Sequence, residues 1–167
     1  MNVVHPACLP IGELLAQCDA RHERRSGPGG QHRNKVATAV VLTHRPTGVR
    51  AEANERRSQA ENHAEAVRRL RVRLAIEIRS LTKREASARW RSRVAGGRLA
   101  INPAHDDFPA LLAAALDAVG AADYDVQAAA SELGITATQL ARFLQREPLA
   151  WVSVNEGRRQ RGLRPLY

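Results

Sequence analysis

Apolar and polar positions in the first part of the chain follow a strand-like pattern. Two segments rich in valine and threonine or in alternating residues, Thr38–His44 and Val49–Ala53, flank the turn-forming tripeptide Pro46-Thr47-Gly48. This arrangement predicts a hairpin whose turn needs a positive φ at its glycine. A third strand is predicted over Cys18–Arg25.

A helix-like pattern follows. Ser58-Gln59-Ala60-Glu61 is a capping box, which marks the start of a helix. Apolar residues then recur at three- and four-residue spacing, and these are Ala60, Ala64, Val67, Leu70, Leu74, Ile78 and Leu81. Arginines are expected on the remaining helix surface, namely Arg68, Arg69, Arg71, Arg73 and Arg79. Residues 1–81 are therefore predicted to form an α+β domain, a small antiparallel sheet packed by one long helix.

The pattern changes again in the second half. Residues 82–106 are basic, hold few apolar positions and are broken by Gly96-Gly97, so we interpret them as a basic extension and linker. Residues 107–167 are rich in alanine and leucine and predict an all-α domain with a basic C-terminal stretch. Its helices are expected at about 108–119, at 126–133, at 136–145 and from Pro148 onward.

The helical region also contains a spacing typical of a helix-turn-helix. Ala130 and Gly134 are four residues apart, and Leu140 and Phe143 follow at positions that would pack between two helices. An ordinary helical bundle uses the same packing, so both interpretations stay open. The expected second helix carries little positive charge, which makes DNA an unlikely partner. A contact with ribosomal RNA, a ribosomal protein or the substrate fits better.

Charge is unevenly distributed along the chain. Residues 21–98 hold 20 basic and seven acidic side chains, a net charge of +13, within a 167-residue chain of net charge +9. A block this rich in arginine is typical of a polyanion binder, with nucleic acid ahead of a membrane surface. No membrane-span pattern or signal-peptide pattern is present, so a cytoplasmic protein is expected. The two cysteines, Cys8 and Cys18, are expected to be reduced thiols, and no metal or cofactor is predicted.

One motif in this basic block suggests chemistry. Gly29-Gly30-Gln31 lies between two predicted strands, and the glycine pair allows backbone conformations that are closed to residues with a Cβ. The glutamine adds one backbone N–H and one uncharged amide, groups suited to stabilising charge that develops on an oxygen. On its own, the motif is equally compatible with a flexible connection that has a polar tip.

The surrounding sequence gives the motif a context, because Arg25–Leu74 resembles the catalytic domain of class I peptide-chain release factors. It is most similar to their short relatives that rescue stalled ribosomes without reading a codon. The matching pieces occur in the same order and spacing. They are Arg-Ser-Gly-Pro-Gly-Gly-Gln-His-Arg-Asn-Lys at 25–35, Ala39-Val40 with Leu42 and His44, Pro46-Thr47-Gly48-Val49, and Arg57-Ser58-Gln59 with Asn62.

This resemblance implies hydrolysis of the ester between a nascent peptide and its tRNA in the peptidyl-transferase centre of the large ribosomal subunit. Gly29 and Gly30 would set the loop conformation, and the backbone N–H of Gln31 would donate to the oxygen that gains charge. The Gln31 amide would position water. Family members are often methylated on this glutamine, so Gln31 is a candidate for N-methylation by a glutamine methyltransferase. The partners implied are large-subunit ribosomal RNA and peptidyl-tRNA, with no cofactor.

Basic and polar residues beside the motif are candidates for RNA contacts, although a solvated surface is the alternative. They are Arg24, Arg25, Ser26, Arg33, Asn34, Lys35, Arg56, Arg57 and Arg68. Two histidines, His32 and His44, could suggest acid–base catalysis. We expect His32 to pack on RNA or stay solvated, and His44 to be structural.

Codon-reading release factors are about twice as long and carry additional decoding domains, for which these 167 residues have no room. The leading hypothesis is therefore a ribosome-dependent peptidyl-tRNA hydrolase that releases peptides without decoding a stop codon. Two alternatives remain. One is a helix-turn-helix nucleic-acid-binding regulator with an inert Gly-Gly-Gln loop, and the other is a non-catalytic ribosome-associated factor.

Overall fold

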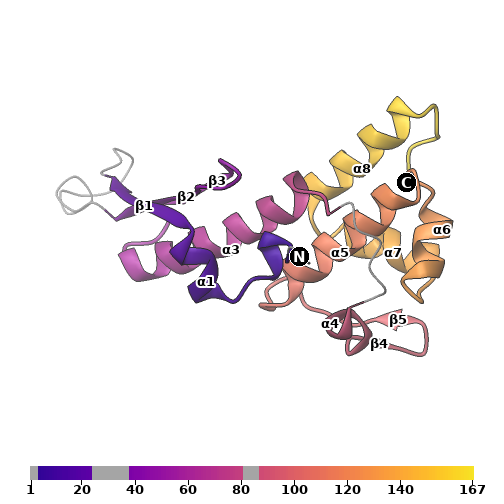
Figure 1. Ribbon diagram of the computed structural model, residues 1–167, viewed down its shortest axis with the longest axis horizontal. Helices are drawn as coiled ribbons and strands as arrows, with labels where there is room; N and C mark the ends of the chain where they lie inside the picture. The colour runs from indigo at the N-terminus through magenta and orange to yellow at the C-terminus, as the bar shows by residue number, and fades with distance from the viewer. Residues whose placement is uncertain (1–3, 24–37, 81–86) are drawn as a thin grey trace. The chain divides into compact units, whose positions relative to one another are not determined.

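The computed structural model describes residues 4–23, 38–80 and 87–167. It divides the chain into two compact units, Met1–Glu77 and Ile78–Tyr167 (Figure 1). The first unit combines a small sheet with helices, and the second consists mainly of helices. The predicted fold class, an α+β domain followed by an all-α helix-turn-helix-like bundle, is confirmed, with a small two-stranded sheet added to the second unit.

The sheet of the first unit is antiparallel, with strand order β1-β2-β3. Its strands are β1 (Cys18–Glu23), β2 (Ala39–His44) and β3 (Arg50–Ala53). The central strand β2 is almost entirely buried, whereas β1 at the edge is exposed over most of its length. The turn between β2 and β3 places Gly48 at φ +72°, as the sequence predicts, and the Gly48 N–H donates to the His44 carbonyl at 2.8 Å.

Helix α3 (Gln59–Glu77) packs on β2 and β3. The Ser58 hydroxyl accepts a hydrogen bond from the Glu61 N–H at 3.4 Å, which is the forward half of the predicted capping box. Leu70 and Leu74 are fully buried, as expected. Ala60 and Ala64 are exposed, so that part of the predicted apolar face is wrong.

The buried face of α3 starts instead at a polar residue, because Asn62 turns inward to satisfy backbone groups. Arg71 is another exception to the predicted pattern. It was expected on the surface, but it is buried and donates from Nη2 to the carbonyl of Ala7 in η1 (Pro6–Cys8) at 3.3 Å. A short helix, α1 (Ile11–Ala16), connects η1 to the sheet.

The second unit begins with structure where a linker was expected. Residues 87–101 form α4 (Ala88–Arg91) and a hairpin of β4 (Val94–Ala95) and β5 (Arg98–Leu99). The reason is Trp90, which is fully buried and donates its indole N–H to the Leu133 carbonyl at 2.8 Å. One buried indole outweighs the arginines around it, because an aromatic side chain of this size removes a large apolar area from water.

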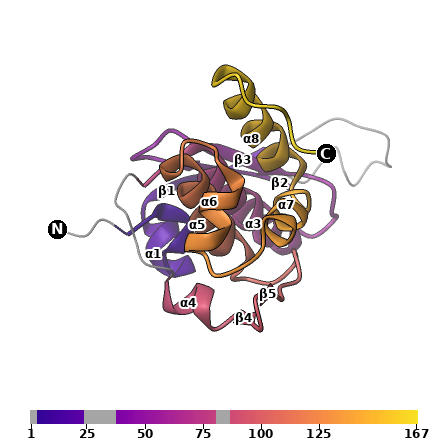
Figure 2. The ribbon, with the colours of Figure 1, turned by 90° about the vertical axis from the view of Figure 1, so that its right-hand side faces the viewer.

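Four further helices complete this unit, with α5 contacted by α4, α6, α7 and α8 (Figure 2). They are α5 (Phe108–Ala121), α6 (Val126–Glu132), α7 (Ala137–Leu144) and α8 (Pro148–Gln160). Phe143 makes edge contacts with Trp90 and Phe108, with ring centroids 6.0 and 5.4 Å apart. Gly134 lies at φ +69° between α6 and α7, which gives these helices the predicted helix-turn-helix-like connection.

The loop between α5 and α6 packs tightly against α8. Asp123 and Tyr124 both have positive φ, at 50° and 65°. Tyr124 lies directly on Gly157, where a Cβ would come within 2.1 Å of the tyrosine ring. Arg161 stacks on the same ring, with its guanidinium carbon 4.3 Å from the centroid. A residue without a side chain at position 157 is therefore what allows the loop to approach the helix.

Candidate functional site

The glycine-glutamine motif lies in the stretch 24–37, outside the described residues. The same stretch holds most of the candidate site residues. They are Arg24, Arg25, Ser26, Gly29, Gly30, Gln31, Arg33, Asn34 and Lys35. The structure therefore informs on the site through the residues that adjoin this stretch and through Arg56, Arg57 and Arg68.

The residues on either side of the stretch are held close together. Glu23 at the end of β1 pairs with Ala39 at the start of β2. Thr38, which precedes β2, accepts a hydrogen bond on its carbonyl from the Asn62 side chain at 2.7 Å. The motif is thus connected to the first unit at two neighbouring points of the sheet, next to the first turns of α3.

Asn62 links these points to the segment before α3. Its side-chain oxygen accepts from the Arg56 N–H at 2.9 Å, and its amide nitrogen donates to the Arg56 carbonyl at 2.9 Å as well as to Thr38. Both amide hydrogens and the oxygen are used, and the residue is fully buried. Asn62 was part of the sequence resemblance without a role. A polar residue on the inward side of a helix that packs a sheet was the signal for one.

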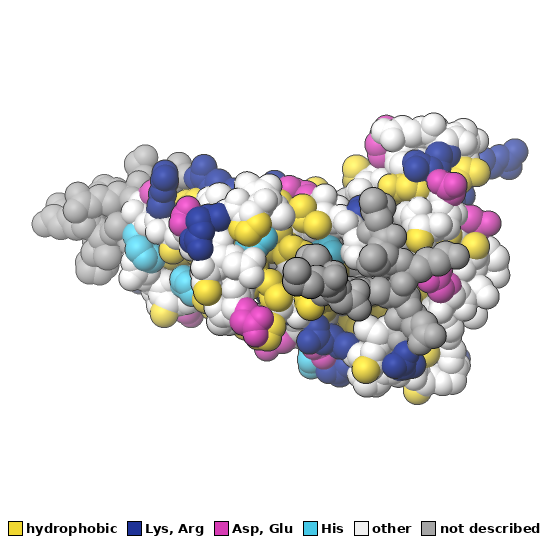
Figure 3. Space-filling model, in the orientation of Figure 1, with side chains coloured by type: hydrophobic (Ala, Val, Ile, Leu, Met, Phe, Trp, Pro, Cys, Tyr) yellow, Lys and Arg dark blue, Asp and Glu magenta, His cyan; other side chains and the backbone are white. Residues whose placement is uncertain are grey.

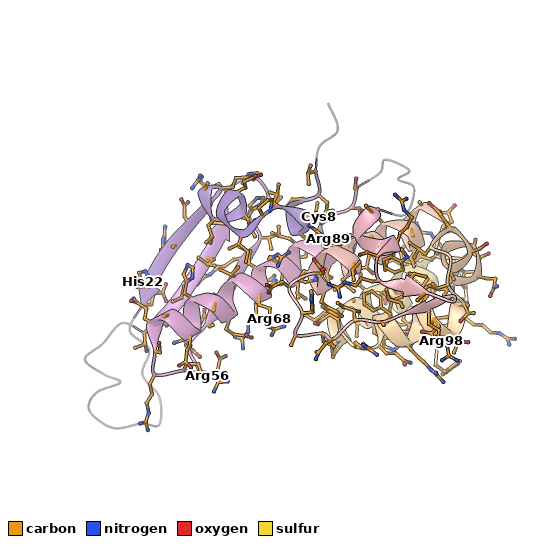
Figure 4. The ribbon with its side chains drawn as sticks, turned by 90° about the horizontal axis from the view of Figure 1, so that it is seen from below. Cys8, His22, Arg56, Arg68, Arg89 and Arg98 are labelled. Carbon is orange, nitrogen blue, oxygen red and sulfur yellow. The ribbon has the colours of Figure 1, made fainter. Side chains whose placement is uncertain are left out.

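Arg56 and Arg57 are exposed in the segment that Asn62 holds. Arg68 is exposed on α3, and Figure 4 shows Arg56 and Arg68 below this helix. Arg68 differs from the other two because its Nε and Nη2 atoms donate to the two carboxylate oxygens of Glu65, at 3.0 and 2.7 Å. This pairing lowers the pKa of Glu65. Arg68 would have to exchange a carboxylate for a phosphate to contact RNA, whereas Arg56 is positioned through its backbone.

A second arginine of α3 supports the fold. Arg69 donates to the Glu52 carbonyl and to the Glu55 carboxylate, each at 2.8 Å, and to Glu65 at 2.9 Å. The Arg69 hydrogen bond is the main cause that lowers the pKa of Glu55. The arginines of this helix are therefore not all available to a polyanion, although the sequence suggested a uniformly basic surface.

His44 has a structural environment, as expected. Its Nδ1 lies 2.7 Å from the Thr47 hydroxyl and its Nε2 lies 3.1 Å from the Gln17 side-chain oxygen, so both ring nitrogens are engaged inside the unit. Burial, with a smaller contribution from Arg45, lowers the pKa of His44. A neutral, enclosed imidazole of this kind supports the turn between β2 and β3.

Cys8 and Cys18 are free thiols. Within residues 4–23, 38–80 and 87–167, no three His, Cys, Asp or Glu side chains are grouped so that they could hold a metal ion. In the same ranges, every helix is too short or too polar to cross a membrane.

Comparison with known proteins places this geometry in a family. The model of the RF-1 domain family matches residues 16–101, just over half of the chain. The chain belongs to this family, that of the class I peptide-chain release factors with a Gly-Gly-Gln catalytic domain. The match contains the motif, the three-stranded sheet and α3, and it continues through α4 and the β4–β5 hairpin.

Relatives of this release-factor family member are named peptide chain release factor 1. The protein of Enterococcus faecalis is 39% identical over 97 residues, which cover 57% of this chain and 27% of that protein. The protein of Streptococcus agalactiae is 42% identical over 97 residues, with the same coverage. That of Caldicellulosiruptor saccharolyticus is 42% identical over 74 residues, 44% of this chain and 21% of that protein. The chain thus spans about a quarter of the length of these relatives.

Proposed function

We propose that this RF-1 family chain is a ribosome-dependent peptidyl-tRNA hydrolase of the cytoplasm that releases nascent peptides without reading a stop codon. The observation that carries the proposal is Gly29-Gly30-Gln31, placed between β1 and β2 in a chain of the release-factor family. The proposed partners are large-subunit ribosomal RNA and peptidyl-tRNA. Arg56 and Arg57 are proposed phosphate contacts next to the motif.

The proposed reaction is ester hydrolysis. Water attacks the ester carbonyl that joins the peptide to the tRNA, the carbonyl oxygen gains negative charge, and the carbon–oxygen bond to the tRNA breaks. The backbone N–H of Gln31 would donate to that oxygen, because a donor already in place stabilises charge as it develops. The side-chain amide of Gln31 would orient the water, while Gly29 and Gly30 permit the backbone path. The released tRNA hydroxyl takes a proton, and the peptide leaves as a carboxylic acid.

The fold supports this proposal by fixing the residues on either side of the motif. The Glu23–Ala39 pair and the bond from Asn62 to Thr38 join the motif to a buried strand and to a helix. Catalytic groups held on rigid elements retain the geometry that the reaction needs. Release without a stop codon is supported by the content of the chain, since the residues outside the family match form a helical unit of their own.

Peptide release from ribosomes carrying labelled peptidyl-tRNA tests the function. The wild-type chain should release peptide when the A site is empty or holds a sense codon, and a stop codon should not increase the rate. Gln31→Ala and Gly30→Ala should each abolish release while ribosome binding and thermal stability stay at wild-type levels. Wild-type release rates in the Gly30→Ala variant would refute the catalytic assignment, and release that requires a stop codon would refute codon independence.

Two outcomes would favour the alternatives. Ribosome binding without release in any condition would indicate a non-catalytic ribosome-associated factor. Sequence-dependent binding to duplex DNA would indicate a regulator, although α7 has a single arginine, Arg142, among its residues. Mass spectrometry of the chain purified from its own cells would test the proposed N-methylation of Gln31, which adds the mass of one methyl group.

A further inference from the structure

The positive charge of the second unit is concentrated in one small substructure. Between residues 87 and 107 there are four arginines and two aspartates, whereas residues 108–167 hold six basic and six acidic side chains. We define the arginine face as Arg89, Arg91, Arg93 and Arg98, from α4 and the β4–β5 hairpin. Figure 3 shows dark blue side chains over this region, and Figure 4 labels Arg89 and Arg98.

This face is built on a rigid base. Trp90 is the buried anchor of α4, and its neighbours Arg89 and Arg91 are exposed because adjacent residues of a helix point in different directions. In the hairpin, Gly96 and Gly97 have φ values of 55° and 72°, the combination that a tight two-residue turn requires. The turn holds Arg98 opposite Ala95.

An aspartate at the start of α5 fixes two of the guanidinium groups. Asp107 lies 2.7 Å from Arg93 Nη2 and 3.3 Å from Arg89 Nε. Side chains that are already held in place lose less conformational entropy when they bind a ligand. Because one carboxylate serves two arginines, the cluster keeps a net positive charge.

The chemistry of the face fits the sugar-phosphate backbone of RNA. Its cations are all arginine, whose planar guanidinium can make two parallel hydrogen bonds to a phosphate. Between residues 87 and 101 no aromatic or amide side chain is exposed, so the face lacks the groups that read or stack on bases. It also has no large exposed apolar side chain, which distinguishes it from the core of a typical protein–protein interface.

The family match assigns this face to the release-factor part of the chain. The match ends at residue 101, so it includes Arg89, Arg91 and Arg98, although these residues fold with the second unit. We propose that the arginine face binds the phosphate backbone of ribosomal RNA and so gives the second unit a direct role in holding the chain on the ribosome. This inference rests on the ribosome-dependent part of the proposed function.

The test compares two triple variants of the full chain, each losing three exposed arginines of the second unit. The first is Arg89→Gln/Arg91→Gln/Arg98→Gln, and the matched control is Arg142→Gln/Arg159→Gln/Arg164→Gln. Ribosome affinity is measured over a range of salt concentrations. Each lost phosphate contact should reduce the slope of log affinity against log salt by about 1, so the first variant should lose about 2–3 and the control close to none.

Hydroxyl-radical footprinting of ribosomal RNA provides a second measurement. Protections seen with the wild type and the control should disappear with the face variant, and saturating amounts of that variant should restore the wild-type release rate. Equal losses in the two variants would indicate general charge, and a loss of affinity with unchanged slope and footprint would indicate a protein partner. Either result would overturn the inference. A wild type that binds with a face-dependent slope but releases no peptide would refute the proposed function alone.

Discussion

Asn62 shows how one buried amide can connect a candidate catalytic segment to a fold. Its three hydrogen bonds join Thr38, Arg56 and α3, and no other side-chain type offers two donors and an acceptor of this size in a neutral group. Because it lies beside the residues that adjoin the motif, we expect it to act as a positioning residue for peptide release.

The Asn62→Ala variant should lose stability and, in addition, release activity. Truncation leaves buried backbone groups of Thr38 and Arg56 without their partners, at a cost of about 2–4 kcal/mol in the free energy of unfolding. Leu70→Ala provides a control on the same helix, since Leu70 is equally buried and its loss costs about 2–5 kcal/mol. Release rates at saturating ribosome concentration, measured well below both melting temperatures, should fall at least tenfold further for Asn62→Ala, on the order of 1.4 kcal/mol in the barrier. Equal rates would mean that Asn62 only stabilises the fold.

His44 should make the stability of the protein depend on pH in a specific window. Its pKa in the folded state is lowered from 6.5, mainly by burial, so the unfolded state takes up a proton more readily. The contribution of the neutral imidazole is therefore complete above pH 6.5 and is lost as the pH falls toward the lowered value.

Melting temperatures measured from pH 8 to pH 5.5 test this expectation. The wild type should lose stability through the lower part of that range, and His44→Gln should lose less because glutamine does not titrate. The carboxylates whose pKa is lowered, Glu55 and Glu65, contribute a separate loss only at more acidic pH, below their ordinary value of 4.5. A variant with the full acid sensitivity of the wild type would contradict the assignment to His44.

The contact of α8 with the α5–α6 loop depends on a missing side chain. In the Gly157→Ala variant, the added methyl group would overlap the Tyr124 ring, so loop or helix must move. We expect a loss of about 1–3 kcal/mol in the free energy of unfolding. The double variant Gly157→Ala/Tyr124→Ala should lose less than the sum of the single variants, because removing the ring removes the overlap. Chemical denaturation of the four proteins gives this comparison, and strict additivity would argue against the overlap.

Much of the architecture follows from local patterns in the sequence. The hairpin turn at Gly48, the cap at Ser58 and the α6–Gly134–α7 connection were all predicted, because each depends on a residue type with a narrow conformational role. Exposed Ala64 and buried Arg71 were not predicted, because a three- and four-residue spacing identifies a face without showing where the sheet and η1 meet it.

Tertiary contacts explain the remaining differences. Residues around Trp90 looked like a linker because arginine dominates their composition, and the position that receives the indole, the Leu133 carbonyl, is 43 residues away. At the candidate site, the sequence identified Arg56 and Arg57 but not the amide that holds Arg56. The pairing of Arg68 with Glu65 was also missed, although the two residues are three apart on one helix, a spacing at which opposite charges meet.

Two compact units, each with its own buried residues, make up the chain. Leu70 is fully buried in the first unit and Leu112 in the second. Each change to alanine should cost about 2–5 kcal/mol, and the double variant should show the sum of the two losses to within about 0.5 kcal/mol. Hydrogen exchange should show increased opening within the altered unit only. Loss of protection in both units from a single substitution would mean that they unfold as one.

Net charge governs how this protein meets its partners. With a net charge of +9 and an isoelectric point near 11, the chain remains strongly positive at every physiological pH. Such a charge accelerates encounter with any polyanion and is sensitive to ionic strength, so affinities for ribosomes are comparable only at equal salt. Variants that remove charge therefore need a control of equal charge.

The exposed edge strand β1 also affects how the protein behaves at high concentration. A free strand edge can pair with the edge of another molecule and start aggregation, and charged side chains oppose that pairing. Along β1, the exposed positions include Asp19, Arg21 and His22, between the half-buried ends of the strand. These side chains act as gatekeepers against sheet extension from one molecule to the next. Sequences engineered from this scaffold should keep them if the protein is to stay monodisperse during purification and storage.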